Sequence, residues 1–158
     1  MSKKILVMVL AMVASALLAT PFIGSVFATE FIPLNFTSVG GDPVSVFRRQ
    51  AGESGNWIST AVYNLLWEGD FVGAAAMEVR LVFHNFGTPN MTYEYYQTVT
   101  FTGTFLQEYA GTLTIVAGQG NWRIVSGTGG LYDLRGQGKM QMIGPGTWSF
   151  TGQAHFEP

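Results

Sequence analysis

The sequence predicts an all-β protein, a closed antiparallel barrel of about eight strands preceded by an N-terminal signal helix. Three observations support this fold. Apolar and polar residues alternate over long stretches of the chain, glycine- and proline-rich turns recur roughly every ten residues, and no long helical period occurs after residue 28. Such a pattern is typical of antiparallel barrels and sandwiches.

Residues 1–28 read as a signal peptide. Lys3 and Lys4 precede an apolar run from Ile5 to Ala19, and the segment ends in small residues with Val26 and Ala28 at the positions that signal peptidase reads. We therefore expect cleavage after Ala28, which leaves residues 29–158 as a single β-barrel domain.

An uncleaved anchor is the alternative, because Ile5–Ala28 is long enough to span a bilayer. Pro21 and Gly24 near its end favour cleavage. The expected location is secreted or in the cell envelope, with no membrane association after cleavage. The chain has no cysteine, so it carries neither a lipoprotein anchor nor a disulfide.

The charge balance argues against nucleic acid as a partner. Residues 29–158 hold six Lys or Arg residues against ten Asp or Glu residues, a net charge of −4. Charged residues make up only 11% of the chain, whereas aromatic residues make up 14%. Threonine, serine, asparagine, glutamine and glycine must therefore supply most of the polar surface.

The clearest strands are Met91–Phe105 and Thr147–Phe156. In each, one set of alternate positions is mostly apolar, and the other is rich in threonine or other polar residues. Both contain "FTG", which places Gly103 and Gly152 on the apolar face. Glycine at such a position lets a sheet coil tightly, so valine there should crowd the interior.

Further strands are expected between the turn sequences "GGDP", "AGESGN", "FGTPN", "AGQGN", "GTGG" and "IGPG". The only helical candidate is the short "GAAAMEV". The expected strands are Phe31–Val39, Ile58–Trp67, Met77–Asn85, Thr112–Ala117, Trp122–Ser126 and Gly138–Ile143.

The glycine-rich stretch "SGTGGLYDLRGQG", residues 126–138, does not predict a phosphate site. It fails to complete GxGxxG and no helix follows it, so no nucleotide cofactor is expected. Asp133 and Arg135 are more readily explained as an ion pair that pins the turn than as a catalytic pair.

The candidates for metal binding and catalysis are few. His84 and Glu78 share a strand face, but Arg80 lies between them, which disfavours a metal and favours a Glu78–Arg80 pair. No G-x-S-x-G motif occurs, so a serine hydrolase is disfavoured. Glu68 and Asp70, next to Trp67, are the candidate carboxylates for acid/base chemistry.

The aromatic side chains on the apolar faces of the predicted strands are the remaining candidate for a binding site. Small barrels either fill their interior with such side chains or enclose one small ligand. If a cavity exists, we expect it to be lined by Phe83, Tyr93, Phe101, Trp122, Trp148 and Phe150.

The order of several motifs resembles the allene oxide cyclase barrel class, which includes plant allene oxide cyclases, dirigent proteins and a bacterial family of unknown function. These motifs are "WEGDFVG", "FTGTF", "GTLTIVAG", "WRIVSGTGGLYDLRGQG" and a final G-x-W-x-F-x-G strand. The bacterial family is the nearest match. The resemblance implies a closed eight-stranded barrel with an apolar interior, and a tight structural corner at Gly127, Gly129, Asp133, Arg135 and Gly136.

The resemblance does not transfer an activity, because the catalytic residues of the plant enzymes have no counterparts that can be matched here. The leading hypothesis is an exported barrel that binds an apolar or aromatic small molecule in its interior, without catalysis and without a cofactor. One alternative is a cyclase or isomerase that uses the same cavity, with Glu68, Asp70 or an inward-facing tyrosine as its polar group. The other is a filled barrel that acts as an envelope or interaction module. The oligomeric state is left open.

Overall fold

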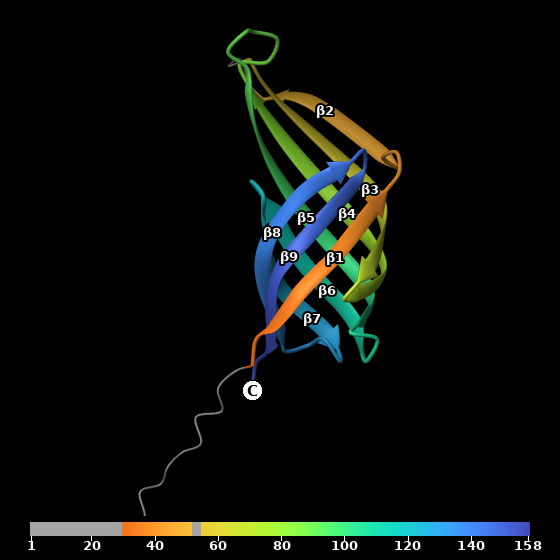
Figure 1. The fold of residues 1–158 in the computed structure, drawn as a ribbon. Coiled ribbons are helices and arrows are strands. Elements are labelled where there is room, and N and C mark those ends of the chain that lie inside the picture. Colours follow the sequence, from red (N-terminus) through yellow and green to blue (C-terminus); the bar gives the residue numbers. More distant parts are fainter. Residues whose placement is uncertain (1–29, 52–54) are drawn as a thin grey trace, which may run out of the picture.

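The computed structural model describes residues 30–51 and 55–158, which form nine antiparallel strands. The sheet order is β1-β9-β8-β7-β6-β5-β4-β3-β2, and an additional pairing of β1 with β3 closes eight of the strands into a barrel (Figure 1). This confirms the predicted closed antiparallel barrel and adds one strand, β2. The strands are β1 Ile32–Gly40, β2 Ser45–Ala51, β3 Asn56–Gly69, β4 Phe71–His84, β5 Thr92–Phe105, β6 Tyr109–Gly118, β7 Asn121–Gly129, β8 Leu134–Gly144 and β9 Thr147–Phe156.

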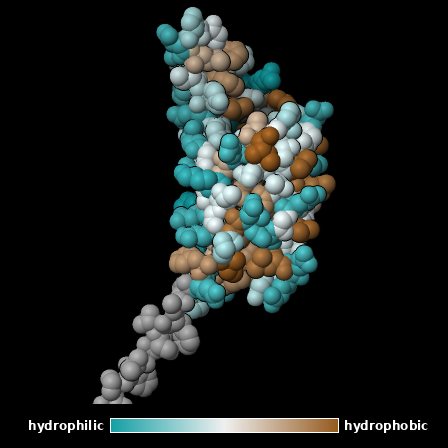
Figure 2. Space-filling view, in the orientation of Figure 1, coloured by the Kyte–Doolittle hydropathy of each residue, from teal (hydrophilic) through white to brown (hydrophobic). Residues whose placement is uncertain are grey.

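The predicted signal helix and its cleavage site lie outside the described residues. Within the described ranges, no helix is long and apolar enough to cross a membrane. Hydrophilic and hydrophobic residues are interspersed over the outer wall near β1, β8 and β9 (Figure 2).

Two elements differ from the sequence-based expectation. Strand β2 was not predicted, because it lies at the sheet edge with six of its seven residues exposed and so shows no apolar alternation. The helical candidate "GAAAMEV" lies within β4, where Ala75 and Met77 are buried while Ala74 and Ala76 are exposed. Tertiary packing therefore overrides the helical propensity of the alanine run.

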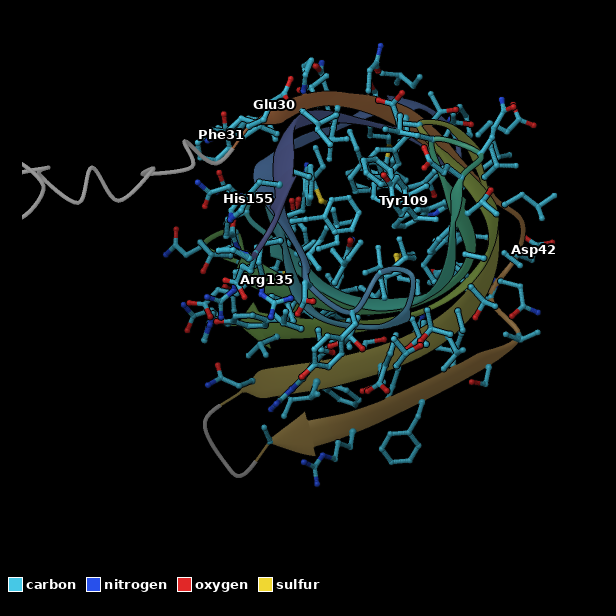
Figure 3. The ribbon with its side chains drawn as sticks, turned by 90° about the horizontal axis from the view of Figure 1, so that it is seen from below. Glu30, Phe31, Asp42, Tyr109, Arg135 and His155 are labelled. Carbon is cyan, nitrogen blue, oxygen red and sulfur yellow. The ribbon has the colours of Figure 1, made fainter. Side chains whose placement is uncertain are left out.

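Aromatic rings fill the lower and middle barrel. Phe36 lies at the centre, with its ring centroid 4.7 Å from that of Phe150, 4.8 Å from Trp67, 5.0 Å from Phe71 and 5.7 Å from Trp122. All five side chains are at most 4% exposed. The view along the barrel in Figure 3 shows side chains extending into the ring, Tyr109 among them. The strand alternation thus produces a packed aromatic core.

Gly103 and Gly152 lie where neighbouring strands approach most closely. Gly103 pairs with Gly73 and Gly111, and a Cβ atom on it would overlap the carbonyl oxygen of Val72. Gly152 pairs with Gly138, and a Cβ atom there would overlap the carbonyl oxygen of Gln137. Both glycines therefore permit sharp coiling of the sheet, as predicted from "FTG".

Trp122 stabilises the second of these bends. Its indole Nε1–H lies 3.0 Å from the carbonyl oxygen of Lys139 and 3.3 Å from that of Thr151, to which it donates. The ring lies beside Gly152, where a side chain would contact it. The buried indole N–H of Trp122 thus has hydrogen-bond acceptors, and these bonds link the side chain to both β8 and β9.

The stretch "SGTGGLYDLRGQG" forms the end of β7, a tight turn and the start of β8. Gly127 and Gly129 end β7, and Gly129 has a φ of 62°, a conformation that favours glycine. The turn inserts Leu131, which is fully buried, into the lower end of the core. Gly136 lies on β8, where a Cβ would press against Ile124 and Ala154.

The predicted ion pair between Asp133 and Arg135 is wrong. Arg135 Nη2 lies 2.9 Å from Glu157 Oε2, and its Nη1 donates to the carbonyl oxygens of Tyr132 and Leu134. Asp133 contributes its backbone carbonyl, which accepts from the amide of Glu157 at 2.9 Å. The turn is therefore fastened to the end of the chain, since antiparallel pairing of β8 and β9 brings Glu157 beside it.

Strand β3 pairs with two different strands on the same edge, one along each part of its length. Its lower part, Leu65–Gly69, pairs with β1 and closes the barrel, whereas its upper part, Asn56–Val62, pairs with β2. Beyond the barrel rim, β2 and the upper parts of β3, β4 and β5 form what we call the projecting sheet (Figure 1). Seen along the barrel, β2 lies outside the ring of strands (Figure 3).

Candidate functional site

The projecting sheet carries a recess of about 310 Å³ that we call the aromatic groove. By strand alternation, Trp57, Ser59, Leu81 and Phe83 continue the face that is interior within the barrel. Above the rim no other part of the described chain covers this face, so Trp57, Leu81 and Phe83 are only half-buried. The groove is lined by Arg48, Trp57, Ile58, Ser59, Leu81, Phe83 and Phe86.

A hydrogen bond between two loops positions the outermost ring. The amide of Phe86 donates to the carbonyl oxygen of Gly55 at 3.0 Å, which fastens the β4–β5 loop to the β2–β3 turn. The Phe86 ring then lies 5.4 Å from Trp57 and 5.5 Å from Phe83, centroid to centroid. These are favourable tilted and edge-to-face arrangements, yet Phe86 remains 47% exposed.

Arg48 is the charged side chain that lines the aromatic groove. It pairs with Ser59 across β2 and β3, so both side chains lie on the groove face. Within the described ranges no carboxylate forms an ion pair with Arg48. The groove therefore combines an aromatic surface with one cation whose hydrogen-bonding capacity is available to a ligand.

The six residues predicted to line a cavity fall into different parts of the molecule. Phe101 and Phe150 belong to the packed core, and Trp122, also buried there, borders a second depression described below. Phe83 lines the aromatic groove, and Tyr93 lies beside it, with ring centroids 6.2 Å apart. Trp148 is partly buried and packs against the core.

Arg48 and Phe86 were not predicted as site residues from the sequence. Arg48 belongs to the unpredicted strand β2, and Phe86 lies in a turn whose glycine and proline suggested only a connection. The sequence feature that could have identified Phe86 as a site residue is its large apolar side chain inside an otherwise polar turn.

The two candidate catalytic carboxylates, Glu68 and Asp70, do not lie inside the barrel. Glu68 is exposed, and Asp70 accepts a hydrogen bond from the backbone amide of Asn35, which gives it a structural role at the β3–β4 turn. Among the described residues, no three His, Asp or Glu side chains are close enough to hold a metal ion.

The outer face of the projecting sheet has a different polar arrangement from the one expected. His84 Nε2 lies 3.8 Å from Glu94 Oε1, and no ion pair joins Glu78 to Arg80 within the described ranges. The Tyr96 hydroxyl donates to Glu94 Oε2 at 2.7 Å, and this hydrogen bond to a carboxylate raises the pKa of Tyr96.

Comparison with solved structures supports the barrel. The chain is similar to the crystal structure of a protein of unknown function from the DUF3224 family of Shewanella oneidensis MR-1, with a TM-score of 0.62 and 13% identity over 82% of this chain and 99% of that one. The likeness establishes the fold. No family model matches the chain, and neither does any curated protein.

A second depression, which we call the outer groove, has a volume of about 960 Å³ and runs from β5 across β6, β7 and β8 to β9. It is broad and open. Its exposed side chains come from the outward positions of these strands, and none of its lining residues within the described ranges is an Asp or Glu. The polar side chains of the outer groove include Tyr96, Asn121, Arg123, Gln137, Lys139 and Gln153.

Proposed function

We propose that this protein binds an apolar or aromatic small molecule, and that the ligand lies in the aromatic groove above the barrel rim. One observation carries the proposal: Trp57, Phe83 and Phe86 face a shared recess without being buried by other parts of the described chain. Clusters of exposed aromatic side chains are more common at binding sites than elsewhere on a protein surface.

The packing of the barrel favours the groove over the interior as the ligand site. The rings around Phe36 contact one another at centroid distances typical of filled cores, and they are nearly inaccessible to solvent. A ligand inside would have to displace them. The groove needs no such rearrangement, and its volume lies at the small end of the range for ligand pockets, suited to a molecule of one or two rings.

Arg48 selects within this class of ligand. A ligand with a carboxylate or sulfonate group could stack on the rings while its anionic group accepts hydrogen bonds from the guanidinium. We therefore propose a preference for amphipathic anions over neutral molecules of the same size. Membership of the allene oxide cyclase barrel class, suggested by the ordered motifs, is part of the proposal and agrees with the barrel fold.

Two fluorescent dyes test the site: the neutral N-phenyl-1-naphthylamine and the anionic 1-anilinonaphthalene-8-sulfonate. Fluorescence titration of the folded protein should show saturable binding of both. Trp57→Ala combined with Phe86→Ala should weaken the binding of both dyes by roughly tenfold or more, because burying one large apolar side chain contributes about 1.5–3 kcal/mol. Arg48→Gln should weaken only the sulfonate.

Phe47→Ala is the matched control, because Phe47 is 63% exposed on the opposite face of the same sheet. Melting temperatures should be compared for all variants so that dye binding to unfolded protein is recognised. Equal binding by the native protein and the double variant would exclude the groove as the site.

We also propose that the protein is exported and processed, on the basis of its N-terminal sequence. N-terminal sequencing of the protein isolated from its own host should give Thr29 as the first residue. Retention of Met1 or of the apolar run 5–19 would contradict cleavage and favour the anchored alternative.

A further inference from the structure

The outer groove brings together side chains from strands far apart in sequence. Arg123 on β7 pairs with Gln137 on β8, which pairs with Gln153 on β9. Two residues away on each strand, Asn121 on β7 pairs with Lys139 on β8. Since paired residues share a face and exposed residues on these strands point outward, the five side chains form two adjacent polar rows on the outer wall.

The two cations in these rows have no acidic partner. Arg123 and Lys139 are diagonal neighbours, and neither forms an ion pair within the described ranges. Lys139 Nζ donates instead to Asn121 Oδ1 at 2.6 Å, which fixes the ammonium group over the groove. In a chain whose net charge is −2, this wall is locally positive and therefore attracts anions.

The remaining polar groups suit a hydroxylated ligand. Gln137 and Gln153 each offer amide donors and a carbonyl acceptor, which matches hydroxyl groups that donate and accept. At the β5 end of the groove, Tyr96 is 53% exposed and supplies a ring surface against which an apolar face can stack. Charge, amides and an aromatic ring thus lie along one open depression.

We propose that the outer groove binds an acidic oligosaccharide, with Arg123 and Lys139 holding its carboxylate or sulfate groups and the amide side chains holding its hydroxyl groups. A nucleic acid fits less well, because the chain has an isoelectric point of about 5.6 and few cations elsewhere to follow a phosphate backbone. This site is separate from the aromatic groove, and it stands whether or not that groove binds a ligand.

Calorimetric titration with polygalacturonate, dextran sulfate, neutral dextran and single-stranded DNA tests the proposal. We expect at least one of the acidic polysaccharides to bind and neutral dextran not to bind. The variant Arg123→Gln with Lys139→Gln should lose roughly tenfold or more in affinity, because it removes two charge-assisted hydrogen bonds. Raised salt should weaken the native complex.

The control variant is Arg49→Gln, which removes one positive charge from the outer face of β2 and is compared with Arg123→Gln alone. It should bind like the native protein. Equal losses in Arg49→Gln and Arg123→Gln, or equal affinity for DNA, would show only nonspecific attraction of polyanions and overturn the proposal. So would the absence of binding to both acidic polysaccharides.

Discussion

Replacing Gly103 by valine is expected to lower the free energy of unfolding by about 3 kcal/mol, the upper end of the usual range for overpacking. The reason is that the new Cβ would overlap the Val72 carbonyl oxygen and press on the Phe101 ring, and backbone moves less readily than a side chain. Gly152→Val should have a similar effect, since its Cβ would overlap the Gln137 carbonyl oxygen and lie close to the Trp122 ring.

Urea denaturation with a common slope for all variants measures this effect. Thr102→Val is the control, because Thr102 is the exposed neighbour of Gly103 on the same strand and should change stability by no more than about 0.5 kcal/mol. Unchanged midpoints for both glycine variants would mean that the strands do not approach as closely as this structure has them.

Phe36→Ala is expected to cost about 3–5 kcal/mol, enough to leave a domain of ordinary stability largely unfolded at moderate temperature. Phe36 contacts four other aromatic rings at the centre of the core. Its removal therefore leaves a cavity, which could be filled only if several strands moved inward.

Thermal unfolding followed by circular dichroism measures this loss. The matched control is Phe31→Ala, which removes a ring that is 54% exposed and contacts mainly His155 at the edge of the barrel. If the two variants lost the same stability, the rings around Phe36 would not form a tightly packed centre.

Side-chain alternation made most of the barrel predictable. In β5, Val99 and Phe101 are buried while Thr98, Thr100 and Thr102 are exposed, and this division follows directly from sequence because one face meets the core. Strand β2 could not be found in this way. Its position beyond the barrel exposes both faces, which removes the periodic signal on which the prediction depends.

Contacts between distant segments account for the other errors. Asp133 and Arg135 are neighbours in sequence, yet Arg135 pairs with Glu157 because β9 returns to the same end of the barrel. Likewise, alternation placed Phe83 on the apolar face correctly but could not show that β4 extends beyond the rim, where that face is uncovered. The sequence identifies a face, whereas the topology decides whether anything covers it.

The pairing of β1 with both β3 and β9 has a consequence for synthesis of the chain. Strand β1 is made before the other strands and β9 after them, so the ring cannot close until β9 has been synthesised. A product that stops before Thr147 retains two unpaired edges, on β1 and β8, each able to recruit a strand from another molecule. Premature termination should therefore yield insoluble material more readily than a smaller, functional barrel.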